Sequence, residues 1–397
     1  MTFELSSRER VRLALNHQES DRVPIDITWT AVPYTDVRRV LGLPPEDLKP
    51  DVWDRVKPGL DVIKRLSVDF IWVGLRGPQA RPPFSFDMQE WTDEWGVTFR
   101  KVTRPDQGDQ FEIHDWPLKE PSPALLDTFA WPDPLDPARY EGVADQVRHL
   151  YETTDYALCG RLGESIWEQG NYLAGQAPWL MYVAANPDFC QDLMTRTAAI
   201  QKQVYLEGLR HIGKYLSIIR LGGEDFGIQT GMLISPRAFR SLVKPILKDV
   251  YMAVKERLAD MGNYDCKLML HSCGAVASII PDLIEIGVDV LDPVQTRAKG
   301  MNALVLKESY GERLSFHGGL DTQGVLPFGT EEDVAEEVRR KLQMFAPGGG
   351  YILCPTHNLQ ADVSGRNAVA LVNAGLACGR YPIARTYERD FLLSLDH

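Results

Sequence analysis

The sequence lacks the features that would place it in several specialised classes of protein. Its 397 residues contain six cysteines, and no two of these form a Cys-x-x-Cys pair, so a disulfide framework is not expected. No apolar run approaches the ~18 residues of a membrane span, and the charged N-terminal segment has no apolar core of a signal peptide. We therefore expect a cytoplasmic protein with free thiols and no membrane segment.

Basic charge and nucleotide-binding motifs are also scarce. Acidic residues outnumber basic residues by 55 to 43, which gives a formal net charge of -12 and disfavours binding to nucleic acid. The glycine-rich fingerprints of dinucleotide- and phosphate-binding proteins are missing, and so is the Gly-x-Ser-x-Gly motif of serine hydrolases. These absences argue against a dehydrogenase, a nucleotide-dependent enzyme or a serine hydrolase.

Short apolar or β-branched segments recur along the chain and alternate with stretches of helical spacing. Continuous apolar strands of this kind are typical of parallel strands buried on both faces. We expect strands at residues 23–27, 70–74, 156–162, 216–223, 266–271, 288–293, 313–319 and 350–355. The sequence therefore predicts an α/β fold in which eight strands close into a (β/α)8 TIM barrel, with a doubly wound open sheet as the alternative.

Other segments predict elements around this barrel. Ser6 or Ser7 precedes helical spacing over residues 8–17, which predicts an N-terminal helix, and further helices are expected at 235–262, 279–287 and 331–345. Residues 76–140 are too rich in proline for a long helix and predict an insertion with a β-hairpin between the second and third strands. We expect residues 1–397 to form one barrel domain that carries this insertion.

Chemically distinctive side chains follow the ends of the predicted strands. In (β/α)8 barrels the catalytic groups lie at the carboxyl ends of the strands. The candidates at these positions are Asp26, Glu164, Glu224, Asp225, His271, Cys273, His317, Asp321, Cys354 and His357. Among them, Asp26, Glu224, Asp225 and His317 are the candidate catalytic residues, although His317 is equally compatible with a packing role and the Glu224–Asp225 pair with a solvated loop.

Imidazole and thiol groups in this set suggest a metal site. His271 and Cys273 follow the fifth strand and His357 follows the eighth, so loops that are distant in sequence can meet at the barrel mouth. Catalytic zinc uses three protein ligands and one open position. We predict zinc bound by His271, Cys273 and His357, with Cys354 as the alternative third ligand and Glu224 or Asp225 as a fourth ligand or proton acceptor. The alternative is that a chance His-x-Cys pair packs in the core.

Several segments resemble the uroporphyrinogen decarboxylase superfamily. They are RERVRLALNHQESDRVPID (8–26), LHSCGAV (270–276), FHGGLDTQGVLPFGTEEDV (316–334) and GGGYILCPTHNLQADVSGRNAVALVNA (348–374). The resemblance extends over nearly the whole chain and is weakest in the insertion. It implies a (β/α)8 fold and one of two chemistries, which are cofactor-free decarboxylation of porphyrinogen acetates and zinc-assisted methyl transfer between small molecules and corrinoid proteins.

Motif details favour the methyltransferase branch of this superfamily. The arginines that bind propionates in the decarboxylases are absent from DITWTAVPYTDVRR (26–39), whereas His271 and Cys273 match the His-x-Cys of the methyltransferases. The third zinc ligand of that branch is a cysteine after strand eight. This position holds His357 here, which instead matches a histidine of the decarboxylases, and Cys354 lies three residues earlier.

The resemblance therefore implies a zinc-dependent methyltransferase. It would move a methyl group between a small methylated substrate, such as a methoxy compound, and a corrinoid carried by a separate partner protein. One alternative is a metal-free decarboxylase of a small carboxylate that uses Asp26, Tyr34 and His357. Another is a metal-binding barrel without catalytic turnover. A homodimer is left open as the oligomeric state.

Overall fold

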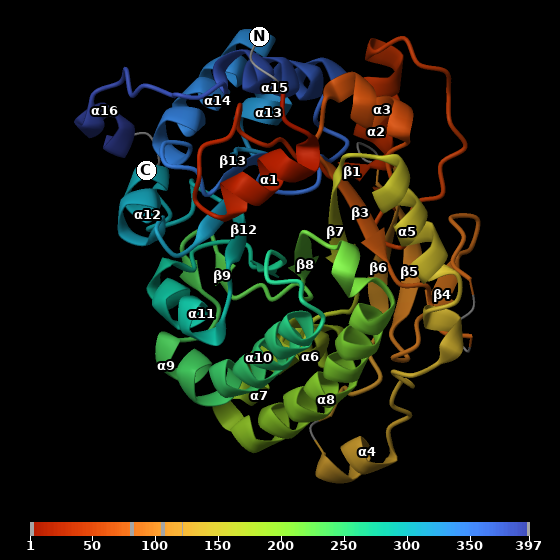
Figure 1. Cartoon of the computed structure of the whole chain (residues 1–397). Helices are drawn as coiled ribbons and strands as arrows, with labels where there is room; N and C mark the ends of the chain where they lie inside the picture. Colours follow the sequence, from red (N-terminus) through yellow and green to blue (C-terminus); the bar gives the residue numbers. More distant parts are fainter. Residues whose placement is uncertain (1–3, 80–82, 105–107, 121, 395–397) are drawn as a thin grey trace.

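A curved sheet of parallel strands forms the centre of the molecule, and helices surround it (Figure 1). The computed structural model describes residues 4–79, 83–104, 108–120 and 122–394. In their order across the sheet, the strands are β14 (Tyr351–Pro355), β13 (Ser315–Leu320), β12 (Val290–Val294), β11 (Lys267–His271), β8 (Ile218–Arg220), β7 (Ala157–Arg161) and β3 (Phe70–Gly74). All neighbouring pairs in this sheet are parallel, as expected for strands joined by helical crossovers.

The segment predicted as the first strand closes this sheet into a ring. Ile25 makes a parallel bridge to Leu353 in β14, and its carbonyl oxygen accepts a hydrogen bond from the backbone N–H of Asp69, immediately before β3. Residues 23–27 thus occupy the place of an eighth strand without forming a regular ladder. This arrangement confirms the (β/α)8 prediction and excludes the open-sheet alternative.

The helices cover the outside of the barrel. α8 and α10 lie side by side on one flank, and α14 packs against α15 on the opposite flank (Figure 1). Their bounds are α2 (Ala31–Val40), α3 (Leu60–Leu66), α4 (Pro123–Thr128), α5 (Val143–Thr153), α6 (Glu168–Ala174), α7 (Gln176–Ala185), α8 (Pro187–Ile212), α9 (Pro236–Ala238), α10 (Lys244–Asp260), α11 (Ile280–Ile286), α12 (Ala303–Tyr310), α13 (Val325–Phe328), α14 (Glu331–Phe345), α15 (Gly365–Cys378) and α16 (Arg389–Ser394). None of the helices in the described residues combines the length and the hydrophobicity needed to cross a bilayer.

The helix predicted over residues 235–262 is interrupted near its start. A π-helical turn at Phe239–Val243 separates α9 from α10, and Pro245 stands in the first turn of α10. Proline has no N–H and its ring clashes with the carbonyl four residues earlier, so the turn that precedes it widens.

The N-terminal helix α1 (Ser7–Leu15) closes the bottom of the barrel. Ser6 caps it by accepting a hydrogen bond from the N–H of Glu9. Val11 and Leu15 pack into a buried layer that the strands contribute from the barrel interior: Phe70, Ala157, Cys159, Ile218, Met269, Val290 and Ile352. Because this end is filled, the opposite end, where the strands finish, is the one that can hold a site.

The proline-rich region forms a small antiparallel sheet beside the barrel mouth. Its strands are β4 (Glu90–Thr92), β5 (Thr98–Arg104) and β6 (Gly108–Asp115), and β5 with β6 is the hairpin that the sequence predicts. Short antiparallel pairs are also formed by β1 (Trp29–Thr30) with β2 (Arg55–Val56) and by β9 (Gly227–Ile228) with β10 (Gly231–Met232). Both β2 and the insertion contribute side chains to the mouth.

A buried carboxylate ties the closing segments together. Asp69 is fully buried and accepts hydrogen bonds from Arg10 at 2.7 Å, from Arg22 at 2.7 and 3.0 Å, and from the backbone N–H of Ile25 at 2.8 Å. Ser7 donates a further bond at 2.8 Å. One side chain therefore joins α1, residues 22–25 and the start of β3.

Replacing Asp69 by asparagine should strongly destabilise the barrel. The change leaves the buried guanidinium of Arg22 without its carboxylate partner and removes one of the two carboxylates, Asp69 and Asp21, that pair with Arg10. Breaking a buried ion pair in this way typically costs about 3–5 kcal/mol. Urea unfolding should show this loss in the free energy of unfolding. The control is Glu90→Gln, which removes a half-exposed partner of Arg100 and should cost less than about 1 kcal/mol. Equal unfolding midpoints for the two variants would contradict the proposed role of Asp69.

Candidate active site

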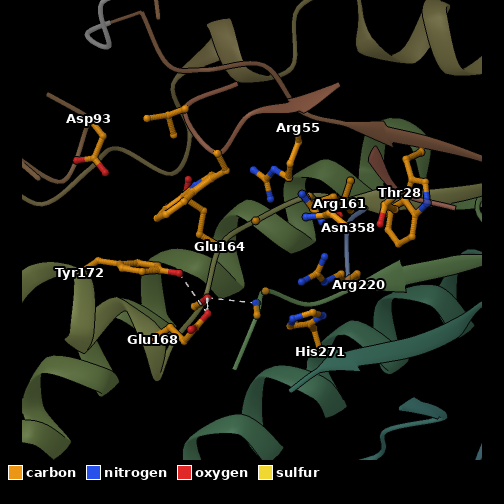
Figure 2. Close-up of a pocket in the computed structure, with 18 of the residues that line it drawn as sticks. Thr28, Arg55, Asp93, Arg161, Glu164, Glu168, Tyr172, Arg220, His271 and Asn358 are labelled. Carbon is orange, nitrogen blue, oxygen red and sulfur yellow. Dashed lines mark hydrogen bonds between the residues drawn. The ribbon is translucent and has the colours of Figure 1, made fainter. Parts of the chain in front are cut away.

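A cavity of about 600 Å³ opens at the carboxyl ends of the barrel strands. The insertion and β2 form its outer walls, and Figure 2 shows Glu168, Tyr172, Arg220 and His271 facing its interior. The barrel side chains that line it, each from a different strand, are Arg161, Arg220, His271, Asp292, His317 and Cys354. The cavity therefore lies where the fold class places catalytic groups.

Three potential metal ligands meet at one edge of this cavity. Oδ1 of Asp225, Nε2 of His271 and Sγ of Cys273 all lie within 4.8 Å of one another. Nε2 of His271 is 3.6 Å from Sγ of Cys273 and 3.7 Å from Oδ1 of Asp225. His271 ends β11, Cys273 follows two residues later, and Asp225 lies in the loop after β8. The predicted His-x-Cys pair is thus joined by one of the two predicted carboxylates.

Glycines allow the two loops to approach so closely. Gly274 has a φ of +81°, and a Cβ atom there would lie 2.3 Å from the carbonyl carbon of Gly227. Any other residue would push the loops apart. Their contact is closed by two hydrogen bonds, from the N–H of Cys273 to Oδ1 of Asp225 at 2.7 Å and from the N–H of Ala275 to the carbonyl of Ile228 at 3.0 Å.

His357, which we predicted as the third ligand, is not a member of this group. It is exposed on the rim of the cavity, and its Nδ1 lies 3.2 Å from the carbonyl oxygen of Asn358 and 3.4 Å from Nε2 of Gln360. The strand that ends at Pro355 is followed by a loop that carries His357 outward. Asp225 takes the place next to His271 and Cys273 that the prediction gave to His357.

Cys354 belongs to a second group, deeper in the barrel. Its Sγ, Nε2 of His317 and a carboxylate oxygen of Asp26 lie within 4.8 Å of one another, and all three residues are buried. Oδ2 of Asp26 is 3.1 Å from Nε2 of His317 and accepts a hydrogen bond from the indole of Trp72 at 3.0 Å. Cys354 is thus placed with Asp26 and His317, not with Cys273.

Asp292, which the sequence reasoning missed, connects the two groups. Its Oδ2 is 2.7 Å from Nδ1 of His271, and its Oδ1 is 2.7 Å from Nδ1 of His317. His271 and Asp292 are register partners in adjacent strands. Asp292 could have been found from the sequence, because it is an acidic residue near the end of the predicted strand 288–293. The other candidates were identified by the same criterion.

The hydrogen bonds determine the protonation of both histidines. Both ring nitrogens of His317 face carboxylates, so both must donate, and the ring is an imidazolium. Burial opposes this charge, but Cys354, Asp292 and Asp26 together raise the pKa of His317 well above its usual value. In contrast, burial and then the charge of Arg220 lower the pKa of His271. His271 is therefore neutral, with its proton on Nδ1 toward Asp292 and a free lone pair on Nε2.

Glu224 has a different environment from its neighbour Asp225. Its carboxylate is buried and accepts hydrogen bonds from the backbone N–H groups of Ile166 and Trp167, both at 2.7 Å. Burial raises the pKa of Glu224 to about 8, although the backbone amides oppose the shift. The side chain therefore holds the loop before α6 and faces away from the cavity.

Glu168 is a further carboxyl group that the sequence reasoning missed. Its Oε2 lies 3.3 Å from the Tyr172 hydroxyl and 3.4 Å from Oγ of Ser165 (Figure 2). Burial, followed by the negative charges of Asp225 and Glu224, raises the pKa of Glu168 well above its usual value. A carboxyl group with a raised pKa thus lines the cavity near the metal-ligand candidates.

Comparison with known proteins identifies the family. The model of the uroporphyrinogen decarboxylase (URO-D) family matches residues 117–376, which is more than half of the chain, so the chain belongs to this family. Among solved structures, a methyltransferase from Methanosarcina mazei matches with a TM-score of 0.60 and 16% identity, over 94% of this chain and 99% of that chain. At this level of identity, the similarity establishes a shared fold.

Other comparisons are weaker. An endo-1,4-beta-xylanase from Penicillium canescens matches with a TM-score of 0.37 and 14% identity, over 59% of this chain and 79% of that chain. This similarity is too weak to support a conclusion about fold or function. No curated protein sequence matches the chain significantly. The molecule is thus a URO-D family barrel whose fold is shared with a methyltransferase.

Histidine NMR should detect the two protonation states. Nitrogen chemical shifts are expected to show His317 as an imidazolium above pH 7 and His271 as a neutral ring protonated on Nδ1. The variants His317→Gln and His271→Gln assign the signals. Because the folded-state pKa of His317 is raised above its unfolded value of about 6.5, its stabilising contribution is complete below that pH and is lost as the pH rises through the folded-state pKa. A neutral His317 ring at pH 7 would contradict the hydrogen-bond assignment.

Proposed function

We propose that this protein is a zinc-dependent methyltransferase that moves a methyl group between a small methylated substrate and the corrinoid of a separate protein. The observation that carries the proposal is the convergence of Asp225, His271 and Cys273, with His271 oriented by Asp292. The family membership and the fold shared with a methyltransferase support it.

The donor set fits zinc. Thiolate, imidazole and carboxylate are the usual zinc ligands, and three of them leave one position open for a substrate atom. Metal-binding histidines commonly donate their second N–H to a carboxylate, as Nδ1 of His271 does to Asp292. Burial and then the charge of Asp225 raise the pKa of the Cys273 thiol, so a cation is needed to stabilise the thiolate beside that carboxylate.

The reaction requires a better leaving group than an alkoxide. In the transfer of a methyl group from a methoxy compound, the C–O bond would break with its electron pair left on oxygen, and the reduced corrinoid of the partner protein would supply the electron pair for the new bond to the methyl carbon. Zinc bound at this site would act as a Lewis acid on the leaving oxygen. Glu168 lines the same cavity, and the raised pKa of its carboxyl group suits it to deliver a proton to the departing oxygen.

The corrinoid is expected on a partner protein. The cavity of about 600 Å³ accommodates a small substrate but not a corrinoid ring with its side chains in addition. Because the bottom of the barrel is filled by α1, the cobalt has to approach from the mouth. We therefore infer that a corrinoid protein docks over the carboxyl ends of the strands.

The residues required by the decarboxylase alternative do not share a site. The hydroxyl of Tyr34 donates to Glu46 and accepts from the N–H of Gly59, both at 2.8 Å. Of Asp26, Tyr34 and His357, only His357 lines the cavity. No specific observation in the described residues favours this alternative.

Metal analysis of the purified chain tests the ligand set. We expect about one zinc per chain, at Asp225, His271 and Cys273, because these three donors are partly exposed whereas Asp26, His317 and Cys354 are all buried. The variants His271→Ala, Cys273→Ala and Asp225→Ala should lose the metal, whereas His357→Ala, Cys354→Ala and the matched control Cys378→Ala should retain it. Zinc retention in Cys273→Ala, or zinc loss in His357→Ala, would contradict the assignment.

The orienting role of Asp292 can be measured separately. An asparagine has one carbonyl oxygen in place of the two carboxylate oxygens, so it can accept a hydrogen bond from only one of the two histidine N–H groups. Because His271 would then be less well oriented, Asp292→Asn should weaken zinc binding by about 10- to 100-fold. The control Asp289→Asn removes a carboxylate at the other end of the same strand, where it binds Lys255, and should leave zinc affinity unchanged. Competition with a chelator provides the measurement.

Methyl transfer itself is tested with reduced corrinoid proteins. Candidate methoxy compounds are incubated with the zinc-loaded enzyme, and conversion of Co(I) to methyl-Co(III) is followed by its absorbance. Activity should be lost in His271→Ala and Cys273→Ala. Full activity in an enzyme stripped of zinc would overturn the mechanism, and zinc binding without transfer from any donor would favour the non-catalytic alternative.

A further inference from the structure

Three arginines occupy one wall of the cavity. Arg161 and Arg220 are the last residues of β7 and β8, and they are direct register partners in these adjacent parallel strands. Arg55, from β2, lies above them, so that the three guanidinium groups follow one another along the wall in Figure 2. Parallel strands that end in register bring such side chains to neighbouring positions.

The protein offers little negative charge to the two arginines at the strand ends, Arg161 and Arg220. Within the described residues, the side chain of Arg161 makes no hydrogen bond or ion pair. Its guanidinium carbon lies 5.8 Å from the centre of the Trp72 ring. Nε of Arg220 is buried without a hydrogen-bond partner, and the closest carboxylate oxygen, on Asp292, is 3.9 Å away and already bound to His271. Arg55 has a closer carboxylate partner, Asp51, at 2.7 Å.

This arrangement is costly unless an anion binds. Burial, together with repulsion from Arg55 and Arg220, lowers the pKa of Arg161 well below its usual value. A buried charge needs a partner, and planar guanidinium groups bind carboxylates in a two-point geometry. Because Arg161 has no carboxylate partner in the described residues and that of Arg220 is 3.9 Å away, this wall is complementary to an anionic ligand.

Aromatic rings line another part of the same cavity. The ring of Trp53 is 5.4 Å from that of Phe99 and 5.6 Å from that of Tyr172, and Phe99 is 5.7 Å from Trp91. All four residues line the cavity. Edge and tilted contacts of this kind create a surface on which a flat ring can pack.

The arginine wall adjoins the candidate metal ligands. A Cβ atom on Gly223 would lie 3.4 Å from Nη2 of Arg220 and 3.6 Å from Cδ2 of His271, so the two side chains approach the same backbone position. A small molecule held by the arginines at one end would thus reach the zinc-ligand group at the other. Because the three arginines lie along one wall, a compact molecule can present a carboxylate to them with one of its ends.

We propose that Arg55, Arg161 and Arg220 form a carboxylate-binding subsite, and that the methyl donor is an aromatic carboxylate with its methylated oxygen directed toward Asp225, His271 and Cys273. The identity of the ligand as a methyl donor depends on the proposed function. The anion-binding subsite does not, because it can be tested by binding alone.

Calorimetry with two matched probes tests the subsite. The probes are 4-methoxybenzoate and its neutral analogue 4-methoxybenzamide, titrated into the full-length chain. We expect the benzoate to bind at least about tenfold more tightly, as charged hydrogen bonds in a buried site require. Equal affinities, or no measurable binding of the benzoate, would overturn the proposal.

Variants locate the source of this preference. Arg161→Gln and Arg220→Gln should abolish it and Arg161→Lys should retain part of it, with circular dichroism confirming that each variant is folded. The control Arg100→Gln removes an arginine of the insertion sheet that is paired with Glu90 outside the cavity, and should keep the full preference. A preference that survives in both Arg161→Gln and Arg220→Gln would also overturn the proposal.

The same titrations with the zinc-free variant Cys273→Ala show whether the carboxylate binds to the arginines or to the metal. Transfer assays then test the proposed methyl donor independently of binding. If the preference disappears in Cys273→Ala, the carboxylate binds the metal and the subsite is wrong. If the preference persists there and the wild-type enzyme transfers no methyl group from 4-methoxybenzoate or other methoxybenzoates, the proposed donor and reaction fail while the subsite stands. Transfer from neutral methoxy compounds with no preference for the benzoate overturns the subsite and leaves the proposed function.

Discussion

The hydrogen bonds that Asp69 accepts hold the barrel closed, and the geometry of the site depends on that closure. This carboxylate joins α1, the irregular segment 22–25 and β3 through two arginines and a backbone amide. Without these contacts, the segment would have little to keep it between β14 and β3, since it forms only isolated bridges there. Asp26 lies in this segment, and the closed ring is what brings it to His317.

From Asp26, a chain of charged hydrogen bonds runs across the barrel interior. Asp26 binds His317, His317 binds Asp292, and Asp292 binds His271. The last link leaves Nε2 of His271 free to face Cys273 and Asp225. Charged side chains buried this deeply are stable only because each one forms a hydrogen bond with the next. The interior therefore acts as a rigid support for the side chains that line the cavity.

The two halves of the cavity have complementary roles. The donors around His271 suit a cation, whereas the arginines at the ends of β7 and β8 suit an anion. The insertion supplies Trp91 and Phe99 to another part of the wall, so it also shapes the binding space. The same barrel rim thus brings candidate metal ligands and arginine side chains together within one small volume.

The sequence by itself determined the barrel, the N-terminal helix, the hairpin and the pairing of His271 with Cys273, because these follow from local periodicity, capping and the order of strands. Only the tertiary structure decided which partners complete the site. His357 is carried outward by its loop, Cys354 points inward, and Asp225 is drawn in because Gly227 and Gly274 let two loops touch. Asp292 and the arginines at positions 161 and 220 acquire their roles from the register between strands, a long-range property that residue spacing does not encode.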